Sequence, residues 1–241
     1  MLRIALLAAT LSFTITNHSQ AQSTCGKADP QTAIRLCTEL FNGAADPGAK
    51  STALANRAIA YLQLGDQDAA LRDAFLLRLI SPHLAIGHGL AGLAFLGKLD
   101  WANAIPLLDE ALKIDAKQQK FLSARGRALL GLQRYDEAIA DFTLAIQLDA
   151  NDIFSIGQRG SAFSKKKLFE KALADANYAI KAEPTNVNWY FVRAEVFTNK
   201  GDISGAIKEL ETILTLDKNN FQAKAIKASL ELAQQVRKQS K

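Results

Sequence analysis

Residues 134–139 read RYDEAI, and a hexapeptide of the same pattern stands 34 residues before it and 34 residues after it. The other copies are DQDAAL at 66–71, DWANAI at 100–105, LFEKAL at 168–173 and DISGAI at 202–207. Each copy has an alanine at its fifth position, and these alanines are Ala70, Ala104, Ala138, Ala172 and Ala206. Five copies in one phase, with no insertion between them, indicate a repeat architecture.

The residues around these hexapeptides keep the same period. Twelve residues before each alanine stands a small residue, and three residues after that a bulky one. The small residues are Ala58, Gly92, Gly126, Gly160 and Ala194, and the bulky ones are Tyr61, Phe95, Leu129, Phe163 and Phe197. Spacings of three and four residues place such side chains on one face of a helix, which predicts two helices in each repeat. The five repeats span 51–84, 85–118, 119–152, 153–186 and 187–220.

This period and this order of small and large residues resemble the tetratricopeptide repeat (TPR). The resemblance covers residues 51–220 and implies an all-α fold, a right-handed α-solenoid of helical hairpins. Because one hairpin cannot bury its apolar stripes alone, neighbouring repeats must stack. We expect residues 22–50 to form an N-terminal segment with a half repeat, and residues 221–241 to form a capping helix with a basic tail.

The turn between the two helices of a repeat departs from the pattern in three copies. Glycine stands there at Gly65 and Gly201, whereas the other repeats have Leu99, Gln133 and Lys167. These replacements loosen the turn chemistry and leave the apolar spacing intact.

Charged residues recur in the same frame. Arg57 precedes Asp73 by sixteen residues, and three more pairs keep this spacing. They are Arg125 and Asp141, Arg159 and Asp175, and Arg193 and Glu209. In the second repeat the two positions hold Ala91 and Leu107, so both charges are lost together. The two positions stand level in an antiparallel hairpin, and we therefore predict four structural ion pairs rather than ligand-binding arginines.

The first residues predict export. Arg3 is followed by an apolar run over 4–15 and by Ser19-Gln20-Ala21, a pattern typical of a secretory signal cleaved after Ala21. The run is too short to span a bilayer readily, so a membrane anchor is the weaker alternative, and an uncleaved apolar tail is another. We expect an exported bacterial protein, periplasmic or secreted, with no transmembrane segment after cleavage. In an oxidising compartment, Cys25 and Cys37 are expected to form a disulfide.

Composition and motifs argue against catalysis and nucleic-acid binding. The formal net charge is +5, and most of it lies in the tail from 221 to 241, so no nucleic-acid partner is expected. His83 and His88 flank a repeat boundary without a nucleophile frame, and there is no phosphate-binding glycine motif. We therefore expect no enzymatic activity, no cofactor and no metal site.

The resemblance also implies a concave groove lined by the first helix of each hairpin. Twelve residues fall on the inward positions: Ile86, Leu90, Leu93, Lys120, Ser123, Arg127, Gln158, Ser161, Lys165, Asn188, Phe191 and Glu195. This wall would suit a segment with apolar residues at one end and an acidic residue at the other. The alternative is that Leu90 and Leu93 pack into the core and leave a shallow polar groove.

These features predict a protein–protein interaction adaptor or scaffold of the cell envelope, which binds a peptide or a partner helix in its groove. The alternative is a structural subunit of an envelope assembly that uses its convex face or its basic tail. The sequence names no particular partner and no oligomeric state.

Overall fold

The computed structural model describes residues 25–239, so the signal sequence expected at 1–21 lies outside the described residues. The described residues form helices and no strand, and the predicted all-α solenoid of helical hairpins is confirmed. The helices are α2 (Pro30–Gly43), α3 (Pro47–Leu64), α4 (Gln67–Ile80), α5 (Ala85–Gly97), α6 (Trp101–Ile114), α7 (Gln119–Gly131), α8 (Tyr135–Leu148), α9 (Ile153–Lys165), α10 (Phe169–Ala182), α11 (Val187–Lys200), α12 (Ile203–Leu216) and α13 (Phe221–Gln239).

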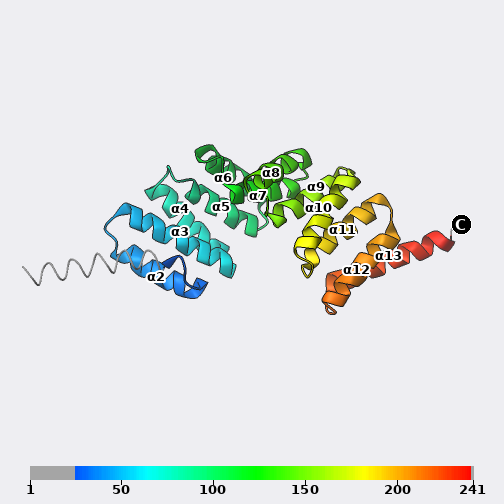
Figure 1. Cartoon of the computed structure of the whole chain (residues 1–241). Coiled ribbons are helices and arrows are strands. Elements are labelled where there is room, and N and C mark those ends of the chain that lie inside the picture. Colours follow the sequence, from blue (N-terminus) through cyan, green and yellow to red (C-terminus); the bar gives the residue numbers. More distant parts are fainter. Residues whose placement is uncertain (1–24, 240–241) are drawn as a thin grey trace, which may run out of the picture. The chain divides into compact units, whose positions relative to one another are not determined.

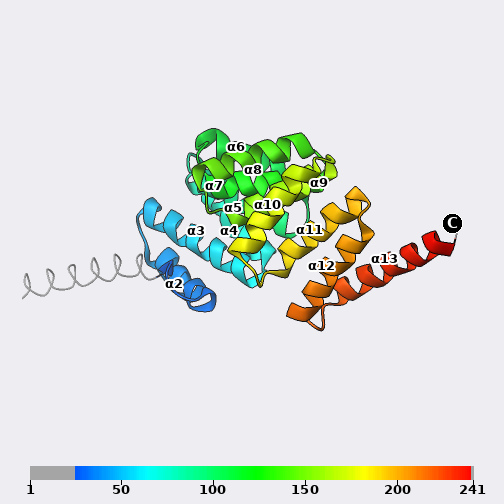
Figure 2. The same ribbon diagram turned by 45° about the vertical axis from the view of Figure 1, so that its right-hand side comes forward.

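The chain forms two compact units, divided after Ala124 within α7. In unit 1, α2 packs on α3, and the hairpins α3–α4 and α5–α6 stack on each other (Figure 1). In unit 2, the hairpins α9–α10 and α11–α12 stack in the same way, and α13 packs on α12 (Figure 2). Each helix therefore contacts neighbours that are close in sequence, as expected of a repeat protein.

Aspartate and asparagine residues start most helices. Asp66, Asp100 and Asp202 each accept a hydrogen bond from a backbone N–H in the first turn of a second helix. In the third and fourth repeats Arg134 and Leu168 occupy this position, and their side chains make no capping hydrogen bond. These two helix starts consequently lack a contact that is typically worth about 1 kcal/mol.

The turn between the helices of a hairpin requires a left-handed residue. Gly65 and Gly201 adopt φ values of 76° and 86°, and Leu99, Gln133 and Lys167 adopt 59°, 61° and 60°. A residue with a Cβ atom is strained in this conformation by roughly 1–2 kcal/mol. The three non-glycine repeats keep the same turn geometry and accept the strain, because the stacked apolar faces hold the hairpins closed.

The first helices of consecutive repeats meet at a position where a glycine faces an aromatic ring. A Cβ atom on Gly89 would lie 2.1 Å from the ring of Phe121, and one on Gly157 would lie 2.3 Å from the ring of Trp189. Glycine is the fifth residue of its repeat in both cases, and the aromatic residue is the third residue of the next. We call these two contacts the size-matched pairs.

Candidate functional site

Four arginines of the first helices form ion pairs inside their own hairpins. The Nε and Nη2 atoms of Arg57 donate to both oxygens of Asp73 at 2.7 Å. Two further arginines bind both oxygens of their carboxylate in the same way, and Arg193 donates to Glu209 through one nitrogen: Arg125–Asp141, Arg159–Asp175 and Arg193–Glu209. All four carboxylates are buried. These arginines hold the two helices of a hairpin together.

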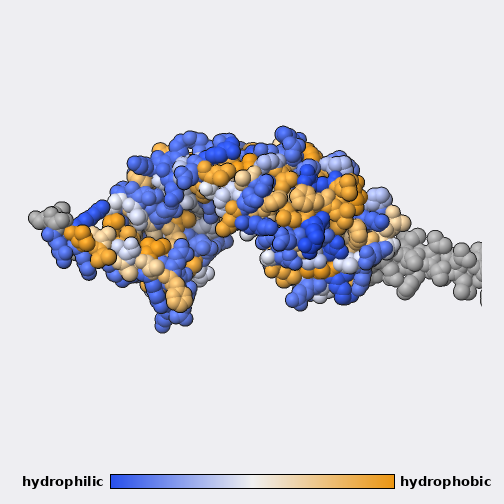
Figure 3. All heavy atoms as spheres, turned by 180° about the vertical axis from the view of Figure 1, so that it is seen from behind, coloured by the Kyte–Doolittle hydropathy of each residue, from blue (hydrophilic) through white to orange (hydrophobic). Residues whose placement is uncertain are grey.

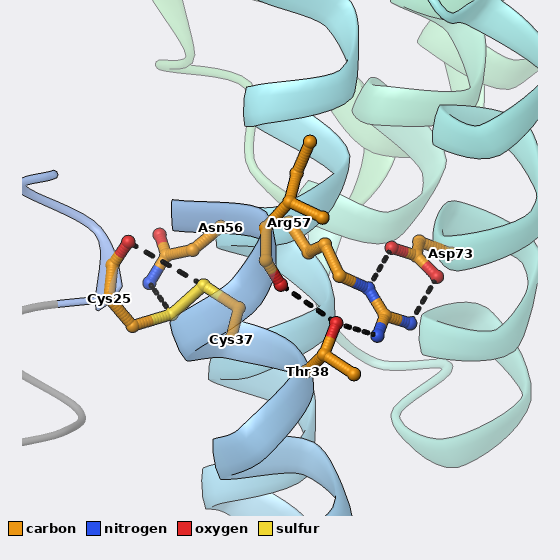
Figure 4. The surroundings of a disulfide bond; sticks show 7 residues. Cys25, Cys37, Thr38, Asn56, Arg57 and Asp73 are labelled. Carbon is orange, nitrogen blue, oxygen red and sulfur yellow. Dashed lines mark hydrogen bonds and ion pairs between the residues drawn. A yellow bond between two sulfur atoms is a disulfide. The ribbon is translucent and has the colours of Figure 1, made fainter. Parts of the chain in front are cut away.

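Three of these arginines also reach the preceding helical layer. Arg57 donates to the hydroxyl of Thr38 on α2 at 2.9 Å, as Figure 4 shows, and Arg159 donates to Thr143 on α8 at 3.3 Å. Arg193 likewise donates to Asn177 on α10 at 2.7 Å. In each of these three cases one guanidinium joins the two helices of its own hairpin to the helix before it.

The N-terminal segment is attached at Cys25. Cys25 and Cys37 are joined by a disulfide, with their Cα atoms 5.2 Å apart, and both side chains are fully buried (Figure 4). They pack with Leu40 of α2 and Ala53 of α3. The crosslink therefore fastens the start of the described chain to α2.

In unit 1, two of the expected groove residues are not on the surface. Leu90 is 1% exposed and belongs to the core cluster with Leu54 and Leu77. Ser123 is buried as well. Ile86 and Leu93 are half-buried and pack against the same cluster, while Lys120 is exposed. The prediction that Leu90 forms part of an apolar groove wall is therefore wrong, and the alternative, in which this residue packs into the core, is correct.

In unit 2, the expected groove residues lie on neighbouring first helices and contact each other. Ser161 of α9 donates to Glu195 of α11 at 3.0 Å, and the Lys165 amine lies 2.7 Å from the same carboxylate. Its hydrogen bond to Glu195 raises the pKa of Lys165. Because Lys165 already has a carboxylate partner, it is not a spare cation for an acidic ligand, contrary to expectation. Phe191 and Gln158 are half-buried, whereas Arg127 and Asn188 are exposed.

A cavity of about 350 Å³ lies between α11, α12 and α13 of unit 2. Its lining combines apolar side chains with four polar ones: Phe191, Val192, Ala194, Leu210, Ile226, Glu195, Thr198, Asn199 and Gln222. Asn199 donates from its side-chain nitrogen to Ser164 of α9 at 2.9 Å, which connects the cavity to that helix. We call the surface formed by α9, α11 and α13 the α9–α11–α13 face.

Sequence reasoning found Phe191 and Glu195 and missed Gln222 and Ile226, which complete the cavity. These two residues are the second and sixth of the segment that follows the fifth repeat, and both are inward positions by the repeat's own numbering. The signal was present in the period. The expectation of a capping helix and basic tail at 221–241 assigns these two positions no part in a groove.

A second exposed surface lies on α4 of unit 1. Phe75 and Leu79 are 42% and 79% exposed, and the guanidinium of Arg78 lies 5.3 Å from the Phe75 ring centre. The other four repeats have polar residues at both equivalent positions: Asp109 and Lys113, Thr143 and Gln147, Asn177 and Lys181, and Glu211 and Thr215. Seen from behind, apolar side chains gather over unit 1, on the right of the view (Figure 3).

The structure describes two histidines, and neither belongs to a cluster that could bind a metal ion. His83 is exposed in a turn, and His88 is half-buried in α5. Burial and the nearby Arg78 lower the pKa of His88. Among residues 25–239, no group of three or more histidine, cysteine or acidic residues is placed to hold a metal ion. Within the same range, no helix has the length and apolar character needed to cross a membrane.

Comparisons with known proteins address the fold. The tetratricopeptide repeat family model matches residues 90–153 and 158–235. No curated protein matches the sequence. Solved structures that resemble the chain include the APC/C hetero-tetramer Cut9–Hcn1, with a TM-score of 0.73 and 16% identity over 83% of this chain and 39% of that one.

Two shorter structures are similar over nearly their whole length. YrrB, a TPR protein described as having an unusual peptide-binding site, gives a TM-score of 0.59 at 16% identity, over 73% of this chain and 91% of that chain. TTC0263, a thermophilic TPR protein from Thermus thermophilus, gives 0.63 at 16% identity, over 76% and 99%. At such identities the likeness concerns the fold alone.

Proposed function

The chain belongs to the tetratricopeptide repeat family, and from this premise we propose that it holds an extended segment of a partner protein against the α9–α11–α13 face. Membership of the family supports a protein–protein interaction scaffold. We choose this surface because of the cavity of about 350 Å³. Its volume lies within the size range of ligand pockets, and its lining combines apolar side chains with a few polar groups.

Apolar area that is accessible in the free protein can be covered by a side chain of the partner. Phe191 is half-buried and Ile226 is 36% exposed, so both lose water when an apolar group enters the cavity. Deeply seated anchors of this kind carry most of the binding energy in protein interfaces. The surrounding polar residues set the register of the bound segment.

Peptides selected from a random displayed library against the full chain test this proposal. We expect binders whose affinity falls at least tenfold in Phe191→Ser, with unchanged helical content by circular dichroism. Tyr178→Ser on α10 is the matched control, because Tyr178 is a 49% exposed aromatic residue outside the face. Equal losses in both variants, or a selection that yields no binder, would reject the α9–α11–α13 face.

We also propose that the protein is exported and works in the periplasm or outside the cell, without catalytic activity. The residue pattern at 1–21 and the buried Cys25–Cys37 disulfide support an oxidising compartment. Intact-mass measurement on protein purified from its host tests this, since the mature chain should begin at Gln22 and lack two thiol hydrogens. A chain that retains residues 1–21 with free thiols contradicts the proposal.

The alternative function is a structural subunit of an envelope assembly, and the exposed Phe75 and Leu79 on α4 favour it. These two apolar residues stand at positions where the other four repeats have polar residues, and both are exposed, which is typical of an interaction surface. Phe75→Thr with Leu79→Gln should abolish assembly in that case and leave peptide binding by unit 2 intact.

A further inference from the structure

The cavity between α11, α12 and α13 has an apolar floor and a polar rim that includes hydrogen-bond acceptors. Val192 and Leu210 are buried beneath it, and the ring of Phe191 and the side chain of Ile226 line its accessible part. Glu195 is the one ionisable residue among the lining residues that the structure describes. Asn199 uses its side-chain nitrogen on Ser164, so its side-chain oxygen remains an acceptor.

The Glu195 carboxylate is held from one side by α9. Ser161 donates to one of its oxygens, and Lys165 forms an ion pair with the other. The Lys165 side chain is 44% exposed and belongs to a different helix from the cavity lining, so it can turn away into water. An ion pair this exposed is weak, and a better partner for Glu195 can replace the lysine.

We propose that the cavity takes an arginine side chain of the bound partner segment, whose guanidinium displaces Lys165 from Glu195. This inference rests on the proposed peptide-binding function and names the anchor residue. Arginine has an apolar stem that suits the accessible apolar lining at Ile226, and its planar head stacks on aromatic rings such as Phe191. Its fork of donors binds a carboxylate through two hydrogen bonds, which the lysine ammonium does not do.

Other anchor residues fit the cavity less well. A glutamate or aspartate of the partner would meet the Glu195 carboxylate and the acceptor oxygen of Asn199. A leucine would fill the floor but would offer no donor to the side-chain oxygen of Asn199, which costs binding energy when that oxygen is shut off from water. A lysine could reach Glu195 only as a point charge, in place of the lysine already present.

The test uses the full chain and a peptide from the random-library selection that competes at the α9–α11–α13 face. Its arginine is replaced by citrulline, which has nearly the same shape and no charge. We expect citrulline to weaken binding at least tenfold in the wild type, and Glu195→Gln to make the arginine and citrulline peptides bind within a factor of two of each other. Lys165→Met should tighten binding of the arginine peptide by about threefold to tenfold, because the competing cation is gone.

Lys166→Met is the matched control. Lys166 is the next residue in the chain, and its amine pairs with Asp136 of α8 instead of Glu195. The variant Lys166→Met removes the same charge from the same end of α9 and should change the affinity for the arginine peptide by less than twofold. Tighter binding in both variants would show that only the general charge of the protein matters, and it would overturn the proposal.

The outcomes separate this inference from the proposed function. Selected peptides that lose affinity in Phe191→Ser and bind equally with arginine or citrulline would overturn the arginine anchor and leave the binding face in place. Selected peptides that are indifferent to Phe191→Ser would reject the face itself. Wild-type helical content in Glu195→Gln excludes unfolding as the cause of any loss.

Discussion

The ion pair between Arg159 and Asp175 offers a direct test of how each hairpin is held together. In the native protein the guanidinium donates to both carboxylate oxygens, at 2.9 and 3.0 Å, and the two side chains are 21% and 12% exposed. Arg159→Ala leaves a largely buried carboxylate without these donors. The cost expected for such a group is about 1–3 kcal/mol of the free energy of unfolding. Because the arginine is partly exposed, we expect a loss of about 2 kcal/mol.

The second repeat supplies the control for this experiment. It holds Ala91 and Leu107 at the two equivalent positions, and Leu107 packs against the core of unit 1. The double variant Arg159→Ala with Asp175→Leu copies that solution into the fourth repeat. Replacing a buried ion pair by apolar residues is often neutral, so the double variant should recover most of the loss.

Thermal and urea unfolding measure the result. A loss of about 2 kcal/mol corresponds to a fall in Tm of about 4–8 °C for a chain of this size. We expect Arg159→Ala and Asp175→Leu each to lower Tm by this amount, and the double variant to lose clearly less than the sum. Strictly additive losses would show that the two side chains do not stabilise the fold through each other, and the structural interpretation of all four pairs would fail with them.

Three further predictions concern other contacts. Gly157→Ala should lose about 1–3 kcal/mol in urea unfolding, because the new methyl group meets Trp189, whereas the same change in a Trp189→Ala background should be neutral or slightly stabilising. Reduction of the disulfide, whose sequence separation is 12, should remove on the order of 3 kcal/mol of local stability. Amide hydrogen exchange should become faster in α2 and stay unchanged in α11, and equal acceleration in both helices would contradict a local role of the crosslink. Burial lowers the pKa of His88, so the folded protein favours its neutral form, and stability should fall as the pH drops below the unfolded pKa of about 6.5. The variant His88→Gln should therefore flatten the dependence of the urea unfolding midpoint on pH between about pH 7.5 and 5. An unchanged slope would assign this pH dependence to other groups.

The periodic features of this protein could be predicted from the sequence because they recur. The hairpins follow from five copies of one spacing, and the pairs such as Arg57 and Asp73 follow from two charges that appear and vanish together. Single positions were harder to predict. Helix α5 is apolar on nearly every side, so hydropathy did not show that Leu90 faces the core.

The candidate site also depends on contacts between helical layers. Gln222 and Ile226 of α13 continue the period and line the cavity together with residues of α11 and α12. The pairing of Lys165 with Glu195 joins two repeats, and no single-repeat pattern contains both residues. Contacts of this kind depend on how one layer lies on the next, and a one-dimensional pattern does not encode that distance.

The size-matched pairs give the stack an order as well as a period. Excision of residues 187–220 would bring Gly157 next to Ala223, with a gap where the indole of Trp189 had been. The array would still contain a whole number of repeats, yet the joint would contain an unfilled void of side-chain size. Repeats joined by such a glycine and aromatic pair are therefore not interchangeable, and loss of one whole repeat at such a joint would leave a packing defect.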